Sequence, residues 1–138
     1  MLSMEVRRKD VFIKSGYEML GDISGIIGLS GITTGTCALS LPRGLASCAL
    51  RRMLMLPDSE PVPDSDINDG VGELINMIAG GAKTRLAPSC YKFNITLPTI
   101  ISGGNHEVFH RTGAYCVVVR FETQERDLFA LELCVSAN

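Results

Sequence analysis

The feature that most constrains the fold is a long helical pattern in the middle of the chain. It begins near Asp66, with Ser65 or Asp66 available as the N-cap, and continues to about Thr84 or Leu86. Apolar residues recur there at offsets 0, 3, 4, 7 and 11: Val71, Leu74, Ile75, Ile78 and Ala82. A helix with one apolar stripe must pack it against another element, so the pattern requires a partner layer.

The same helix has a second stripe on its opposite side, which predicts a polar face turned away from the core. Its members lie at offsets 0, 4, 7, 11 and 14: Asp69, Glu73, Asn76, Gly80 and Lys83. Four glycines also fall in this segment, Gly70, Gly72, Gly80 and Gly81, and each interior glycine costs about 0.8–1.0 kcal/mol relative to alanine. Close approach of another backbone, from this chain or from a docking partner beside Gly80, would compensate. An ordinary solvated face, with glycines packed under a strand, is the alternative.

The partner layer is predicted from the flanking segments. Residues 6–14, 23–30 and 36–41 are expected to form an antiparallel meander, 91–97 a strand ended by Pro98, and 114–123 with 127–135 a hairpin. Residues 45–55 are expected to form a first helix, separated from the second by a proline-punctuated loop at 57–64. The sequence therefore predicts one α+β domain over residues 1–138, in which an antiparallel sheet packs on two central helices. Residues 36–41 and 129–134 are loosely alike, which suggests a strands-helix-helix-strands pseudo-repeat.

Composition narrows the function classes. The chain has 138 residues, 46% apolar, and a net charge of −2, which excludes a disordered chain and gives no basic footprint for nucleic acid. Gly, Ser and Thr interrupt even the most apolar stretch, so no membrane span is predicted. The first residues do not resemble a secretory signal, and the chain is expected to be cytoplasmic.

The five cysteines are predicted to be free thiols. They are odd in number, widely spaced and without a Cys-x-x-Cys pair, which argues against a disulfide framework or a thiolate zinc site. Cys37, Cys116 and Cys134 lie in apolar strand-like runs, where a thiol behaves as a small core residue.

One short motif suggests metal chemistry. His106-Glu107-Val108-Phe109-His110 matches the His-Glu-x-x-His pattern, in which a helix presents two zinc-binding imidazoles one turn apart. Flanking glycines and Val108-Phe109 favour an extended chain, where residues four apart lie roughly 13 Å apart. A structural or surface role for His106 and His110 is therefore expected, and no metal site is predicted. Zinc protease activity stays open only if this segment is helical.

The polar stripe carries a resemblance to a known family. Asp69-x-x-x-Glu73-x-x-Asn76 resembles the active-site helix of the CheC, CheX and FliY chemotaxis phosphatases, most closely the CheX branch. Pro98 looks like the proline that completes the family pattern, although 21 residues separate it from Asn76, one fewer than in that pattern. The resemblance extends over almost the whole chain. It departs at the N-terminus, where Met1–Glu5 leave no room for the family's first helix, and an exposed apolar patch with weaker stability is expected in consequence.

The resemblance implies an activity and roles for these residues. The family hydrolyses the aspartyl phosphate of a CheY-like response regulator, and Asn76 would orient the attacking water while Glu73 pairs with a partner lysine. Asp69, Gly80 and Lys83 would contribute to docking, and Pro98 belongs to the motif loop. No cofactor is expected in this chain, because Mg²⁺ would sit on the phosphorylated partner. A homodimer that extends its sheet across the subunits is also implied.

A second class of function is left open beside the phosphatase. The same fold could serve as a non-catalytic receiver-binding or dimerisation module, and burial of Asn76 would favour that alternative.

Overall fold

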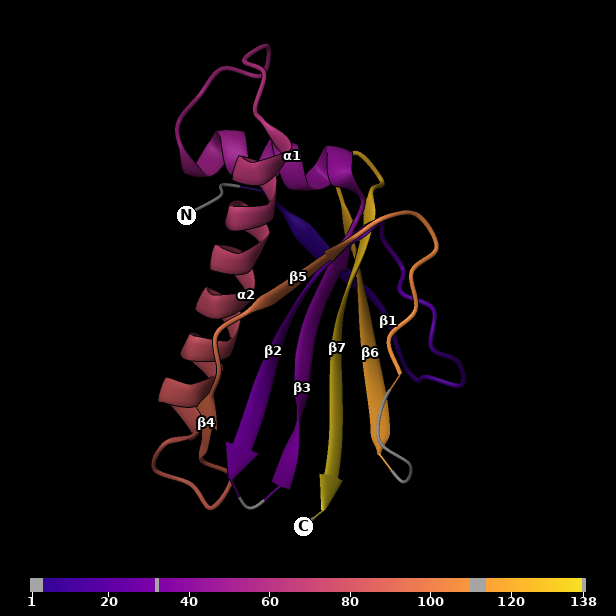
Figure 1. The fold of residues 1–138 in the computed structure, drawn as a ribbon, viewed down its shortest axis with the longest axis vertical. Coiled ribbons are helices and arrows are strands. Elements are labelled where there is room, and N and C mark those ends of the chain that lie inside the picture. Colours follow the sequence, from indigo (N-terminus) through magenta and orange to yellow (C-terminus); the bar gives the residue numbers. More distant parts are fainter. Residues whose placement is uncertain (1–3, 32, 110–113, 138) are drawn as a thin grey trace.

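A single antiparallel sheet and two helices build the protein (Figure 1). The computed structural model describes residues 4–31, 33–109 and 114–137. The elements in chain order are β1 (Val6–Ile13), β2 (Ile23–Gly31), β3 (Thr33–Leu41), α1 (Arg43–Met53), α2 (Asp64–Leu86), β4 (Phe93–Ile95), β5 (Thr99–Ser102), β6 (Tyr115–Thr123) and β7 (Leu128–Ala137). The predicted α+β class is confirmed.

The strand order is β1-β6-β7-β3-β2-β4, with β5 also paired to β2. The predicted β6–β7 hairpin is confirmed, and β2 and β3 form a second hairpin. The meander of the first three strands is wrong, because β1 pairs with β6 and not with β2. Alternation along a sequence locates a strand but does not choose its partner; here the matching apolar pairs, such as Ile13 opposite Val117, lie more than 100 residues apart.

Both helices lie against the sheet (Figure 1), and both contribute buried apolar residues to the core. Helix α1 crosses one end of the sheet, and α2 runs beside β2 and also contacts β3, β4 and β5. The core between them contains Ile23 and Ile27 of β2, and Val71 and Ile75 of α2, all at most 1% exposed. At Gly25 of β2 the missing side chain leaves room for α2, since a Cβ there would lie 3.1 Å from Val71 and Ile75.

The start of α2 differs from the prediction. The helix begins at Asp64, Pro63 is its N-cap, and no side chain caps it. The N-cap expected at Ser65 or Asp66 is therefore wrong. The fixed φ of Pro63 already suits the entry to a helix, and its carbonyl accepts hydrogen bonds from the amides of Asp66 and Ile67.

Two cysteines are paired, against the prediction. Cys116 and Cys134 lie opposite each other on β6 and β7 and form a disulfide. Their sequence separation of 18 gave no local signal, because the hairpin register alone brings the two side chains together. Cys37 is a buried free thiol, as predicted, and burial raises its pKa to about 11.

Helix α2 covers one face of the sheet at β2, but the same face stays exposed at β1, β6 and β7. Ile13, Val117 and Leu133 are in register across β1, β6 and β7 and are 71%, 37% and 42% exposed. Val11 and Tyr115 lie two residues away on the same face and are 51% and 71% exposed. The exposed apolar patch expected from the sequence is therefore present. Among the described residues, no helix has the length and apolar character needed to cross a membrane.

Candidate functional site

The polar stripe of α2 faces solvent, as its periodicity predicts. Asp69, Glu73, Asn76 and Lys83 are exposed, and Gly80 is half-buried. Glu73 and Asn76 are three residues apart on one helix, so their side chains are neighbours on this surface.

The buried side of α2 is rotated slightly from the predicted stripe. Val71 and Ile75 are buried as expected, together with Ile67 and Ala79, which the sequence prediction missed. Ile78 was expected in the core but is 37% exposed, and Leu74 and Ala82 are only half-buried. Helix α2 packs on β2 near one edge of the sheet, so a row at spacing four faces the sheet and the flank bearing Ile78 lies outside the contact.

The glycines of α2 divide into two kinds. A Cβ on Gly70 would lie 3.0 Å from Leu50 of α1, and a Cβ on Gly72 would lie 3.6 Å from the Cγ of Pro98. These two glycines allow close packing within the chain. Gly80 and Gly81 have nothing within 4 Å of the corresponding position, so no neighbour in the described structure accounts for them.

The edge of the sheet beside α2 is interrupted where Pro98 lies. Leu29 of β2 pairs with Ile95, and Ile26 pairs with Thr99. Between these pairs, residues 96–98 stand opposite two residues of β2, so the edge has one extra residue, as in a β-bulge. Proline has no amide hydrogen to donate to a ladder, which explains the break at this position.

This interruption, residues 96–98, is called the linker below. The amide of Thr96 donates to the Gly28 carbonyl at 3.0 Å, and the Gly28 amide donates to Thr96 Oγ1 at 2.8 Å. At its other end Pro98 packs beside Gly72, the residue before Glu73. The structure therefore brings Pro98 next to the helix that carries Glu73 and Asn76. The sequence prediction missed β5, although Thr99-Ile100-Ile101 after the proline is a strand-like run.

The His-Glu-x-x-His segment does not have the geometry of a zinc site. Residues 106–109 are not helical, and Glu107 forms a bridge with Glu18. His110 lies outside the described residues. No group of three or more potential metal ligands occurs in the part of the chain that the structure describes. The helix that the zinc protease alternative requires is therefore not formed at 106–109.

His106 instead holds a polar network together. Its Nδ1 lies 2.8 Å from the Gly103 carbonyl, which can only accept, so Nδ1 is the donor of this hydrogen bond. Ser24 Oγ lies 2.7 Å from Nε2 and 2.9 Å from Ser40 Oγ. Ser24 is fully buried, so this Ser–His pair cannot meet a substrate and serves the structure.

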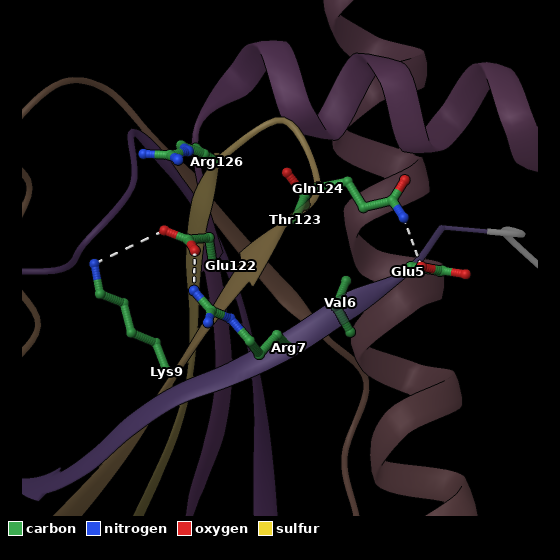
Figure 2. Close-up of a pocket in the computed structure, with 8 residues that line it drawn as sticks. All are labelled: Glu5, Val6, Arg7, Lys9, Glu122, Thr123, Gln124 and Arg126. Carbon is green, nitrogen blue, oxygen red and sulfur yellow. Dashed lines mark hydrogen bonds and ion pairs between the residues drawn. The ribbon is translucent and has the colours of Figure 1, made fainter.

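A separate hollow lies where β1 meets the β6–β7 turn (Figure 2). It has a volume of about 480 Å³ and is lined by Glu5, Val6, Arg7, Lys9, Glu122, Thr123, Gln124 and Arg126. Arg7 donates to Glu122 at 2.5 Å, and this bond, with the charges of Lys9 and Arg126, lowers the pKa of Glu122. None of the residues predicted for the site lines this hollow.

Comparisons with known proteins agree with the fold. The family profile described as chemotaxis phosphatase CheX matches residues 23–122. The chain is 26% identical to a chemotaxis protein CheX from Desulfovibrio desulfuricans, with a TM-score of 0.86 over 99% of this chain and 89% of the other. It is 30% identical to chemotaxis protein CheX from Vibrio vulnificus, with a TM-score of 0.83 over 99% and 89% of the two chains.

A more distant structure has the same fold. The CheX–CheY–BeF₃–Mg²⁺ complex from Borrelia burgdorferi matches at 21% identity and a TM-score of 0.74, over 96% of this chain and 83% of that one. Comparison with curated protein sequences found no significant match.

The fold is that of the CheC-like chemotaxis proteins. Within that class, the chain belongs to the chemotaxis phosphatase CheX family.

Proposed function

We propose that this protein hydrolyses the aspartyl phosphate of a CheY-like response regulator, with α2 as the active-site helix. The observation that carries the proposal is the exposure of Glu73 and Asn76 side by side on α2, with Pro98 packed next to them at Gly72. Family membership supports the reaction, and the structure from Borrelia burgdorferi supports a CheY-type partner, because it holds a CheX of this fold together with CheY.

The reaction needs little covalent work from this chain. Water attacks the phosphorus of the acyl phosphate, the bond from phosphorus to the aspartyl oxygen breaks, and inorganic phosphate and an aspartate carboxylate are formed. An acyl phosphate has a good leaving group, so catalysis consists mostly of placing water in line and stabilising the spread charge. The Asn76 amide can both accept from and donate to a water, which suits it to this placement.

The remaining residues of the stripe have docking roles in this proposal. Glu73 pairs with a lysine of the partner and fixes the position of the partner along α2. A charge-assisted hydrogen bond suits this role because it is shorter and stronger than a neutral one. Asp69 and Lys83 add outer charge contacts, and the open surface at Gly80 lets the partner approach closely. No cofactor is assigned to this chain, and Mg²⁺ belongs to the phosphorylated partner.

We also propose that two copies form a homodimer by extending the sheet at β1. Within the described residues this strand pairs only with β6. Its first half carries Arg7, Arg8 and Lys9 and a register shift between Arg8 and Asp10, and these features discourage pairing. The second half, Asp10–Ile13, is regular and its last three residues are apolar, so we assign the contact to it.

The test of the phosphatase is the rate of phosphate loss from a CheY receiver phosphorylated by acetyl phosphate with Mg²⁺. Wild type should accelerate it, and Asn76→Ala should lose about a hundredfold in rate because the water is no longer oriented. Glu73→Ala should raise KM about 30-fold, as expected when a desolvated charge loses its partner.

Matched controls are available in the β6–β7 turn. Gln124→Ala and Glu125→Ala remove an exposed amide and an exposed carboxylate away from α2 and should leave the rate unchanged. Asn76 is exposed, so the burial that would favour a non-catalytic module is absent. If wild type binds the phosphorylated receiver without accelerating phosphate loss, the binding module replaces the phosphatase.

A further inference from the structure

Leu97 is a large apolar side chain that stays 87% exposed although the backbone on both sides of it is fixed. Thr96 is bonded to Gly28 through both its amide and its hydroxyl, and Pro98 packs beside Gly72. The Thr96 hydroxyl also lies 3.1 Å from the Leu97 carbonyl, to which it can donate. Leu97 is therefore held out to solvent by a fixed linker.

The linker lies beside Asn76. At one end, Pro98 and Ile100 approach Gly72 of α2 within 3.6 Å of its Cβ position. At the other end, Phe93 and Asn94 of β4 line one hollow together with Lys83 of α2. Residues 96–98 therefore run alongside the turns of α2 between Gly72 and Lys83.

Asn76 lies on the side of α2 that faces this linker. Gly72, Asn76 and Lys83 are at offsets 0, 4 and 11, which places them within about 40° of one another around the helix axis. Asn76 is thus on the linker's side of the helix, one turn after the residue that Pro98 touches. A protein that receives Asn76 therefore approaches the side of α2 along which the linker with Leu97 runs.

We propose that Leu97 is the apolar docking side chain of this site, inserted into an apolar depression beside the phosphorylated aspartate of the receiver. The inference rests on the proposed function, because it takes the receiver as the occupant. Asp69, Glu73 and Asn76 supply polar contacts on one flank of the contact and Leu97 supplies apolar area on the other. Because the backbone on both sides of Leu97 is already fixed, binding has to order only its side-chain rotamers, and much of the gain from burial remains as affinity.

The experiment compares wild type, Leu97→Ser and Leu97→Met on a CheY receiver phosphorylated by acetyl phosphate with Mg²⁺. Burial of a leucine side chain is worth about a tenfold change in affinity or more. Leu97→Ser should raise KM about tenfold with kcat within twofold of wild type, and Leu97→Met, which keeps the apolar volume, should restore KM. Met55→Ser removes another apolar side chain, which lies just after α1 and is 91% exposed, and it should change neither constant.

Binding without turnover separates this inference from the proposed function. The same variants are titrated with the receiver loaded with BeF₃⁻ and Mg²⁺, a stable mimic of the phosphorylated form. If wild type binds but does not hydrolyse, the phosphatase fails, whereas a tenfold weaker complex of Leu97→Ser still supports the docking role. Unchanged KM and Kd in Leu97→Ser, or a fall in kcat alone, would overturn it. All variants should unfold at the wild-type temperature, since the changed side chains are exposed.

Discussion

Asp10 and Glu122 are carboxylates held in their charged form by arginines at the β1–β6 contact. Arg120 donates through Nε to Asp10 at 2.7 Å, and this hydrogen bond lowers the pKa of Asp10 below its ordinary value of 3.8. The hydrogen bond from Arg7 likewise lowers the pKa of Glu122 below 4.5. Both groups bind protons less readily in the folded chain than in the unfolded one.

The two lowered pKa values predict that the folded state loses stability in acid. Stability from the two carboxylates is fully present above their ordinary pKa values and is lost as the pH falls through the lowered ones. The free energy of unfolding, measured by urea titration, should therefore fall from pH 5 toward pH 2. In Asp10→Asn the slope over that range should be smaller. An identical slope in the variant would show that the Asp10 contact persists in the unfolded chain or is not formed.

At single residues, the sequence predicts exposure better than pairing. The exposed positions of Glu73 and Asn76 follow from helical periodicity alone, because the rest of the helix fixes which side is buried. The Cys116–Cys134 disulfide could not be predicted in this way, since the two residues meet only after β6 and β7 pair in one register. Leu97 was missed for a similar reason: its exposure depends on a break in a sheet edge that involves β2.

Helix α2 carries two adjacent glycines, and both leave room for a Cβ atom. Gly80 and Gly81 have nothing within 4 Å of a Cβ position, so alanine fits at both without a clash. Each change should stabilise the helix by about 0.8–1.0 kcal/mol through propensity. Gly80→Ala and Gly81→Ala should therefore raise the free energy of unfolding by similar amounts in urea titrations.

The two variants should differ in function. Gly80 lies on the stripe with Glu73 and Asn76, whereas Gly81 is turned 100° away around the helix. Gly80→Ala should raise KM for the phosphorylated receiver, and Gly81→Ala should act as wild type. Equal KM values for both variants would remove Gly80 from the docking surface.

Element types could be predicted more completely than element contacts. Both helices and most strands follow from periodicity, because a helix or strand buries one face at its own repeat. The edge strand is divided at Pro98, and the sequence prediction ended the strand there, so it did not include β5. The predicted meander is wrong because the partner of β1 is β6, which lies more than 100 residues away in the sequence and cannot be identified from local alternation.

The whole molecule exposes an apolar strand segment at one edge of its sheet. If two copies pair through Asp10–Ile13, wild type should sediment at twice 14.9 kDa at micromolar concentration. Ile13→Lys places a charge on the last residue of that contact and should shift the protein to a monomer. Met55→Lys is the matched control: Met55 is exposed just after α1, and this change should leave the dimer intact. Monomeric wild type, or dimeric Ile13→Lys, would contradict the proposed contact.

The break at Pro98 also affects what happens when many copies meet. A sheet grows into a fibril only if each added chain has a second edge strand with a continuous row of unpaired N–H and C=O groups, to which the next chain can pair. Here the far edge is cut by the linker, and the near edge is cut by the register shift between Arg8 and Asp10. If two copies pair through the short segment Asp10–Ile13 as proposed, neither copy keeps a long template, and assembly should end at two chains.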